Sequence, residues 1–552
     1  MDPKNPLSAI RAAGARCWDC LDRPAPSALL AWLVPLAFGL VALALGQDAN
    51  WDLMNYHRYG PYALLAGRIG FDLAPGQWQS YFNPALDLVY HGLNRVLPAP
   101  LAGFAMGTLH GLNFVLLLGL TRRLVAGRRA ALLLALAGML GAGFLSEVGN
   151  SMGDNLTALC VLGAMLVLVA RWDRMGARSL LLAGLVAGVG TGLKLTNAVY
   201  ALAMCLALLS LAGGVGRRAL SAFVFGLGVL AGMAASAGFW YWKMWQVFGN
   251  PLFPQFNNIF KAPLAAPWGI GDTSWLPKGL LEKLLWPFIF TLHPARVIEL
   301  PIRQLIWPFV YLLFLALLCR ALLRRGPGAP SDGRQRFMLL FFALAYLVWL
   351  NLFGIYRYLV PLELMAPLVA WLLMQRLLPA AQAGRIAGVA LLLVAMAVYP
   401  THSWGHAGWA RAGFRAELPA LPAPEQNLVF IVHGDPPMSW LVPLFPRALA
   451  FVSLGSGFPE SPAYLARMQA MLAQRGGPFY TILAYPHHPG ADPALRDSDI
   501  QAVAQLRARA VATLERYGLA MDPASCRPYD AYIGQQLTMY QLCVVTRKPS
   551  GQ

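Results

Sequence analysis

Long apolar runs separated by short polar loops dominate residues 28–400. Runs such as 28–45, 130–145 and 219–238 approach the ~20 apolar residues that a helix needs to cross a ~30 Å hydrocarbon layer. The two runs that flank Lys194 are short and nearly continuous, so they could also form one bent or re-entrant helix pair. The pattern predicts a mainly α-helical, polytopic membrane protein with about eleven transmembrane helices. These spans are expected near residues 28–46, 102–120, 130–146, 155–170, 179–193, 196–213, 219–238, 303–323, 336–352, 359–376 and 384–400.

The hydrophobic pattern changes near residue 401, where short apolar stretches typical of strands alternate with helical patterns. The expected strands are "NLVFIVHG", "ALAFVSL", "FYTILAY" and "YQLCVVTR", and the expected helices are "SPAYLARMQAMLAQR" and "IQAVAQLRARAVATLERYG". Such alternation predicts a small α/β domain. We place this domain at residues 425–552, after a Pro-rich linker at residues 401–424.

Composition and charge agree with a membrane protein and give it an orientation. Of the 552 residues, 58% are apolar and 12% are charged, and the formal net charge is +18. The basic residues cluster in loops between apolar runs, which is the positive-inside pattern of cytoplasmic loops and argues against nucleic-acid binding. The clusters are Arg122, Arg123, Arg128 and Arg129; Arg171, Arg174 and Arg178; Arg217 and Arg218; Arg320, Arg324, Arg325, Arg334 and Arg336; and Arg376 with Arg385.

This orientation assigns each segment to one side of the membrane. The N-terminal segment 1–27 is expected in the cytoplasm, and an odd number of spans then places the C-terminal domain outside, together with the outer loops 47–101 and 241–302. An extracytoplasmic domain permits disulfides, so Cys526 and Cys543, which are its two cysteines, are expected to form one. The location that we expect is a bacterial inner membrane, with the C-terminal domain in the periplasm.

Ionisable residues gather at the expected outer ends of the spans, where burial is costly and a function or a partner is needed. They are Asp52, His57, Arg58, Arg68, Asp72, Asp87, Glu147, Asp154, Lys194, Lys243 and Arg357. Asp52 could cap a loop helix that starts near Leu53, act as a general base toward an acceptor hydroxyl, or do both. Asp154 could cap the fourth span, or share a divalent cation such as Mg²⁺ or Mn²⁺ with Asp52.

Lys194 and Arg357 lie close to the outer ends of spans. They could extend toward lipid head groups, or they could bind a lipid-linked phosphate or pyrophosphate. The outer loop at residues 241–302 is rich in aromatic residues, Pro and Asn. This composition suits a loop that lies on the membrane and lines an apolar groove, and the stretch "LLEKLLWPFIFTLHP" within it is expected to form an interfacial helix.

Five motifs in the membrane part resemble those of the GT-C superfamily of integral membrane glycosyltransferases, which use polyprenyl-phosphate-linked sugars. They are "WDLMNYH…GR", "GDN", "GTGLKLTN", "FGNPLFPQFNNIFKAP" and "YRYLVPLELM". The resemblance implies an inverting sugar transfer to a glycan, lipid or protein acceptor, with membrane lipids as further partners. The paired acidic residues of some branches are absent, because Leu53 follows Asp52.

The resemblance also implies roles for individual residues. Asp52 maps onto the catalytic base. Lys194, Arg357 and Tyr358 map by position onto contacts with the donor phosphate. Beside these residues, we expect Arg58 at the donor phosphate as well, and Asp154, His57 and Tyr56 to bind the acceptor or orient the reacting groups.

Two other classes of function remain open from the sequence. A transporter or lipid flippase also carries charges inside its membrane part, although the chain shows no internal repeat. A non-catalytic scaffold could use the outer domain for binding.

Overall fold

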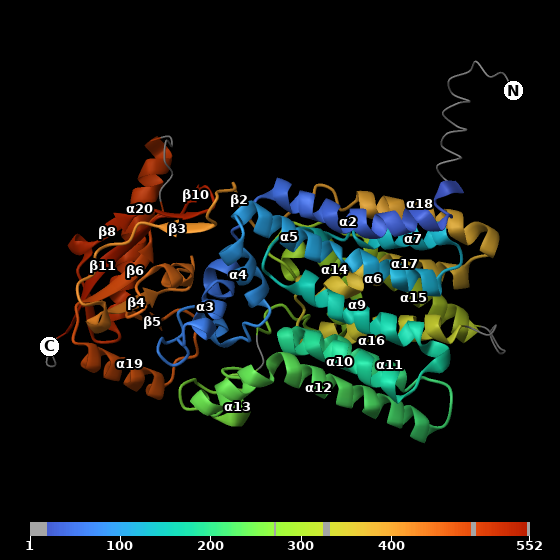
Figure 1. Ribbon diagram of the computed structural model, residues 1–552, viewed down its shortest axis with the longest axis horizontal. Coiled ribbons are helices and arrows are strands. Elements are labelled where there is room, and N and C mark those ends of the chain that lie inside the picture. The colour runs from blue at the N-terminus through green and yellow to red at the C-terminus, as the bar shows by residue number, and fades with distance from the viewer. Residues whose placement is uncertain (1–18, 270–271, 324–331, 487–492, 549–552) are drawn as a thin grey trace, which may run out of the picture.

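The structure is a computed structural model that describes residues 19–269, 272–323, 332–486 and 493–548. The molecule is elongated, with a bundle of helices at one end and the strand-rich C-terminal domain at the other (Figure 1). The segment that follows the first long helix lies between the two parts. The helices of the bundle are α2 (Pro24–Leu45), α5 (Ala99–Gly111), α6 (Asn113–Leu124), α7 (Arg128–Gly138), α8 (Ala142–Ser146), α9 (Asp154–Ala170), α10 (Ala177–Leu193), α11 (Ala198–Leu208), α12 (Val215–Phe248), α15 (Ile306–Leu323), α16 (Gly333–Leu352), α17 (Val360–Leu377) and α18 (Ala380–Met396).

The lengths of these helices indicate a membrane protein. Within the described ranges, 6 helices are long and apolar enough to cross a membrane. They are Pro24–Leu45, Ala99–Leu124, Val215–Phe248, Ile306–Leu323, Gly333–Leu352 and Tyr356–Leu377. Shorter apolar helices occupy Asp154–Ala170, Ala177–Leu193, Leu195–Leu208 and Gln382–Met396. Each predicted run is therefore helical, while the number of about eleven spans stays a prediction.

Lys194 lies at a break between two helices. Its backbone is extended between the end of α10 and the 3-10 turn η4 (Leu195–Asn197), which leads into α11. The two apolar runs around Lys194 thus form separate helices. The N–H of Lys194 still donates to the carbonyl of Gly190, so the end of α10 fixes the position of this residue.

Small residues at every fourth position hold α10 against α12. A Cβ atom at Gly184 would collide with the carbonyl of Phe225, and one at Gly188 would collide with the carbonyl of Val229. From the other side, a Cβ atom at Gly232 would collide with the carbonyl of Leu185. Close approach of this kind is how small-xxx-small patterns pack helices inside membranes.

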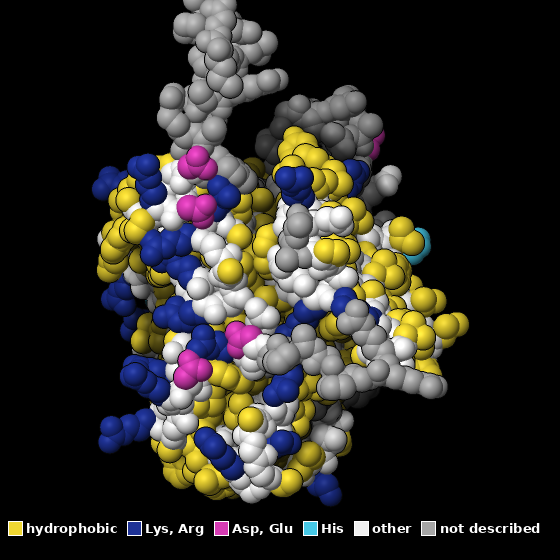
Figure 2. Space-filling view, turned by 90° about the vertical axis from the view of Figure 1, so that its right-hand side faces the viewer, with side chains coloured by type: hydrophobic (Ala, Val, Ile, Leu, Met, Phe, Trp, Pro, Cys, Tyr) yellow, Lys and Arg dark blue, Asp and Glu magenta, His cyan; other side chains and the backbone are white. Residues whose placement is uncertain are grey.

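Basic side chains gather on the end of the bundle that is remote from the C-terminal domain. Figure 2 shows this end, with many Lys and Arg side chains and few acidic ones. Arg122 and Arg123 lie in the last turn of α6, Arg320 lies in the last turn of α15, and Arg376 lies in the last turn of α17. Arginines that the sequence clusters between the apolar runs therefore gather at one end of the folded bundle.

The segment between α2 and α5 is folded rather than an open loop. Its elements are β1 (Gln47–Asp48), the π-helix η1 (Leu53–His57), α3 (Tyr59–Leu65), the 3-10 helix η2 (Gln77–Tyr81) and α4 (Asp87–Val96). The later outer segment contains α13 (Asn257–Phe260) and α14 (Gly279–Leu292). Leu280, Leu281 and Leu292 of α14 are strongly exposed, as an interfacial helix requires.

The C-terminal domain has the α/β pattern that the sequence predicts. Its main sheet has the order β5-β4-β6-β11-β7, with β8 paired to β11. β4 is parallel to β5 and β6, whereas β11 is antiparallel to β6. The strands are β4 (Leu428–Val432), β5 (Ala450–Leu454), β6 (Phe479–Ala484), β7 (Leu519–Met521), β8 (Arg527–Tyr529) and β11 (Tyr540–Arg547), and the helices are α19 (Pro462–Arg475) and α20 (Pro493–Glu515). Cys526 and Cys543 form a disulfide.

Residues 401–424 pack against both parts of the molecule. β2 (His406–Ala407) pairs with β1, and β3 (Phe414–Ala416) joins β9 (Ala531–Ile533) and β10 (Gln536–Leu537) in a second small sheet. Trp409 fills the space beside Gly103 and donates to the carbonyl of Leu43, 2.7 Å away. The predicted linker, residues 401–424, thus contains short strands and connects the C-terminal domain to the C-terminal end of α2 and the N-terminal half of α5.

Candidate active site

Four segments far apart in the sequence bring ionisable side chains together at the outer end of the bundle. They are the start of η1, the start of α9, the break after α10 and the 3-10 turn η6 (Tyr356–Leu359) before α17. Each is the end of a helix or an irregular turn, where a side chain can project beyond the packed core.

Asp52 forms an ion pair with Arg357. The guanidinium Nη1 lies 2.5 Å from the carboxylate Oδ2, and the same nitrogen is 3.4 Å from Sδ of Met152. The Asp52 side chain caps no backbone N–H, so the interpretation of Asp52 as a helix cap is wrong. Burial would raise the pKa of Asp52, but the guanidinium of Arg357, with His57 and Lys194, lowers it below its usual value.

Asp154 forms the second ion pair, with Lys194. The Lys194 Nζ lies 2.6 Å from Oδ2 of Asp154 and donates to the carbonyl of Met152 at 2.9 Å. Asp154 is the first residue of α9, and Gly153 occupies the N-cap position before it, so the interpretation of Asp154 as the cap is also wrong. Met152 contacts both cations, through its carbonyl and its sulfur. The cations bind carboxylates instead of extending to lipid head groups.

Aromatic side chains enclose the two ion pairs. The ring of Tyr358 lies 5.3 Å from Nζ of Lys194 and 5.5 Å from the guanidinium of Arg357, within the range of cation–π attraction. The Tyr56 hydroxyl is 3.5 Å from Oδ2 of Asp52. These rings exclude water from the charges and strengthen their interactions.

Two further acids belong to this cluster, although no role is predicted for them from the sequence. Asp87, at the start of α4, lies 2.7 Å from Nδ1 of His57. Glu147 is fully buried, neither of its oxygens finds a donor among the described residues, and its carboxyl lies against that of Asp154. The cost of burying an acid near the end of a span marks both residues in the sequence, but it does not show which side chains they contact.

Arg58 lies apart from the cluster. Its Nε donates to the carbonyl of Trp440 at 2.9 Å, and its guanidinium lies 3.8 Å from the centre of the Phe414 ring. Arg58 thus contacts the C-terminal domain, and the structure does not bring it to the predicted donor phosphate. The other predicted site residues, Asp52, Tyr56, His57, Asp154, Lys194, Arg357 and Tyr358, lie in the cluster or directly beside it.

The acidic and histidine side chains of the cluster are not arranged to coordinate a divalent metal ion. Across the described ranges, no group of three or more His, Cys, Asp or Glu side chains is arranged to hold a metal. Asp52 and Asp154, the predicted ligands, each bind a cationic side chain, which a metal ion would have to displace. The residues present therefore do not fit a divalent ion in this arrangement.

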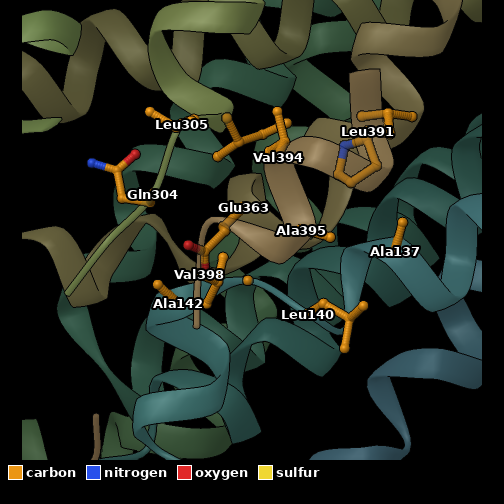
Figure 3. Close-up of a pocket in the computed structure, with 13 residues that line it drawn as sticks. Ala137, Leu140, Ala142, Gln304, Leu305, Glu363, Leu391, Val394, Ala395 and Val398 are labelled. Carbon is orange, nitrogen blue, oxygen red and sulfur yellow. The ribbon is translucent and has the colours of Figure 1, made fainter. Parts of the chain in front are cut away.

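A small apolar pocket lies nearby, between α7, α17 and α18 (Figure 3). Glu363 is its charged residue, and its carboxylate accepts hydrogen bonds from Tyr356 and from the N–H groups of Gly143 and Phe144. The space, about 30 Å³, admits about one water molecule. A sugar or a lipid needs more room, so this pocket is not a candidate site for either of them.

Comparison of the chain with protein-family models gives no match, and comparison with curated proteins gives no significant match. The resemblance to the GT-C superfamily therefore rests on the five sequence motifs.

Proposed function

We propose that this protein is a membrane glycosyltransferase that transfers a sugar from a polyprenyl-phosphate-linked donor to an acceptor hydroxyl, with inversion. The observation that carries this proposal is the double ion pair, Asp52 with Arg357 and Asp154 with Lys194, at the outer end of an apolar helical bundle. It offers a carboxylate for the acceptor hydroxyl and two cations for the phosphate of the donor, beside helices that can contact its lipid chain.

Donor binding activates the base in this mechanism. In the free protein Arg357 and Lys194 neutralise Asp52 and Asp154. The phosphate of the donor competes for both cations, because a guanidinium binds a phosphate with two parallel hydrogen bonds and an ammonium binds it as a point charge. As Arg357 turns to the phosphate, Asp52 loses the partner that lowers its pKa and becomes a stronger base. It then accepts the proton of the hydroxyl as this attacks the anomeric carbon, while the cations hold the leaving phosphate.

The membrane orientation follows from charge. The basic end of the bundle is placed in the cytoplasm by the positive-inside pattern, and the cluster and the C-terminal domain then face the periplasm of a bacterial inner membrane. The disulfide between Cys526 and Cys543 supports this side, since disulfides persist in oxidising compartments. Protease protection of residues 401–552 in inner-membrane vesicles tests the orientation, and digestion of the domain in right-side-out but not in inverted vesicles is expected.

The test of the function measures release of polyprenyl phosphate by the purified protein in lipid bilayers. The donors are undecaprenyl-phosphate-linked glucose, galactose, mannose and arabinose, and water serves as the simplest hydroxyl acceptor. We expect release by the wild type and a rate about 10²- to 10⁴-fold lower for Asp52→Asn, the usual contribution of a general base.

Asp530→Asn is the matched control, because Asp530 lies in the C-terminal domain beside Tyr532 and away from the cluster. Equal release by wild type and Asp52→Asn would exclude Asp52 as the base. If the wild type releases no lipid phosphate from any donor but moves intact lipid-linked sugar across the bilayer, the protein is a flippase.

A further inference from the structure

His57 and Asp87 form a buried dyad beside the ion pairs. The Nδ1 atom of His57 lies 2.7 Å from Oδ1 of Asp87, and the two side chains are only 4% and 7% exposed. Asp87 is the first residue of α4, and the imidazole of His57 is the side chain that its carboxylate binds in the described structure. The pair has the geometry in which a carboxylate fixes a histidine tautomer.

This pairing leaves the other ring nitrogen available. The carboxylate of Asp87 accepts the Nδ1 proton, so in the neutral imidazole the lone pair is on Nε2. Nε2 is buried and finds no hydrogen-bond partner among the described residues. The Tyr56 ring packs on the imidazole with centroids 4.0 Å apart and restrains its rotation. A buried, unpaired acceptor is costly, which points to a polar partner that arrives with the reaction.

The charge in direct contact with His57 is the carboxylate of Asp87, from α4. The other charges close to the dyad belong to the ion pairs of Asp52 with Arg357 and of Asp154 with Lys194, which are each balanced. An imidazolium at this position would therefore be compensated by Asp87.

A proton taken up by Asp52 is expected to pass to a stronger base. The ordinary pKa of an aspartate is about 3.9 and that of a histidine about 6.5. The His57 ring lies 4.0 Å from the ring of Tyr56, whose hydroxyl is 3.5 Å from Oδ2 of Asp52, so His57 lies beside the hydrogen-bond partner of Asp52.

We propose that His57, held by Asp87, is the final acceptor of the proton that sugar transfer releases; this inference rests on the proposed function. The O–H bond of the acceptor breaks as its oxygen bonds to the anomeric carbon, and the carbon–oxygen bond to the lipid phosphate breaks with its electron pair remaining on the phosphate. The proton passes from the hydroxyl to Asp52 and then to Nε2 of His57, with Asp87 balancing the imidazolium charge. Water removes it after the product leaves.

The test is the pH dependence of kcat for lipid-phosphate release, measured from pH 5 to 9 in the bilayer assay above. The wild type is expected to lose activity as the pH falls across this range, because His57 must be neutral to accept the proton. Asp87→Asn removes the negative charge that favours the imidazolium, so its midpoint is expected to move to lower pH and its kcat at pH 7 to fall about tenfold or more.

His57→Gln is expected to lose the midpoint in this range, with a donor KM within about twofold of the wild type. Asp87→Glu keeps the charge and should restore part of the rate.

His91→Gln is the matched control. His91 lies on α4 four residues after Asp87, is half-buried, and faces Arg58 and Arg95 instead of the cluster. Its kcat and midpoint should equal those of the wild type.

Several results would overturn the inference. A wild-type midpoint below pH 5, an unchanged kcat and midpoint in His57→Gln, or a higher donor KM at constant kcat would each exclude His57 as the proton acceptor. The wild-type profile requires no variant, so the test stands even if a variant fails to fold. An inactive wild type would overturn the proposed function itself, and the role of the dyad with it.

Discussion

At the scale of single residues, Glu147 is the acid of the candidate site whose carboxyl contacts neither a cation nor a histidine in the described structure. Arg357 and Lys194 match Asp52 and Asp154, so an ionised Glu147 would leave one buried negative charge without a partner. Two ionised carboxylates repel each other, whereas one proton held between Glu147 and Asp154 makes them a hydrogen-bonded pair. Burial and the neighbouring Asp154 raise the pKa of Glu147 well above its usual value. The carboxyl of Glu147 therefore works as a neutral donor to Asp154.

A protonated Glu147 makes folding stability depend on pH with a definite sign. Above the ordinary glutamate pKa of about 4.3, the folded protein holds a proton that the unfolded chain has released. Stability therefore falls as the pH rises from that value toward the folded-state pKa of Glu147. Glu147→Gln keeps a donor toward Asp154 without a titrating proton, so it should unfold at a higher temperature than the wild type at pH 8, with the difference shrinking toward pH 5.

Thermal unfolding in detergent between pH 5 and 8 measures this effect. Glu425→Gln is the control, because Glu425 is exposed in the turn η7 (Pro424–Gln426), and it should follow the wild type at every pH. A Glu147→Gln variant that is less stable than the wild type at pH 8 would show that the ionised carboxylate is the native form.

At the scale of elements, the contact between α10 and α12 sets the position of Lys194. Gly188→Ala adds a methyl group where the carbonyl of Val229 already lies, and neither backbone can move without separating the helices. We expect a stability loss of about 1–3 kcal/mol, as for overpacked cores, and lower transfer activity because Lys194 shifts from Asp154.

Gly226→Ala on the same α12 helix is the control. A Cβ atom at Gly226 meets nothing within 4 Å, so this variant should be as stable and as active as the wild type or slightly more stable. Thermal unfolding and lipid-phosphate release on both variants check the prediction, and equal stability of the two would show that the helices are not held by close backbone approach.

The elements that the sequence predicts well are those with a strong hydrophobic pattern. The apolar runs are all helical, and the four strands and two helices predicted after residue 424 are present as β4, β5, β6, β11, α19 and α20. β7, β8, β9 and β10, with two or three residues each, are not predicted from the sequence. The elements that it missed are too short to carry a pattern. β1 and β2 have two residues each, and β3 has three. They exist because partners distant in the sequence supply their hydrogen bonds.

The sequence predicts most residues of the candidate site, but it does not predict which acid forms an ion pair with which cation. Burial cost marks Asp52, Asp154, Lys194 and Arg357 individually, because ionisable groups at the ends of spans are rare. It does not say which acid meets which cation, since Asp52 and Arg357 are 305 residues apart. Arg58 illustrates the limit, because it follows His57 directly yet points to Trp440 in the C-terminal domain.

At the scale of the whole molecule, the C-terminal domain holds the segment that carries Asp52. The hydroxyl of Ser439 in η8 (Ser439–Leu444) donates to the carbonyls of Met54 and Asn55 in η1. Further along, Leu73 pairs with the edge of β5, where its N–H donates to the carbonyl of Phe451 at 2.9 Å and its carbonyl accepts from Ser453. The C-terminal domain therefore contacts the segment that carries Asp52. Its sheet continues into residues 47–101 through the pairing of Leu73 with β5.

A buried ion pair between Arg68 and Asp72 stabilises the contact between residues 47–101 and the C-terminal domain. Arg68 donates two hydrogen bonds of 2.6 Å to Asp72 and two of 2.5 Å to the carbonyls of Arg447 and Leu449, while Asp72 accepts from the N–H of Phe451. Both side chains are almost fully buried, so removal of one partner leaves the other charge uncompensated.

Arg68→Met should therefore weaken the contact between the C-terminal domain and residues 47–101. Because these residues carry Asp52, the candidate site should be less well ordered as well. We expect a local stability loss of about 3–5 kcal/mol, faster hydrogen exchange at Leu73 and along β5, and a lower kcat without a change in the acid residues themselves. Arg467→Met is the matched control, because Arg467 is exposed and makes one 3.3 Å contact to the carbonyl of Gly70 in the same segment. If Arg68→Met exchanges faster at β5 but keeps the wild-type kcat, the domain does not position Asp52 and serves a separate role in acceptor binding.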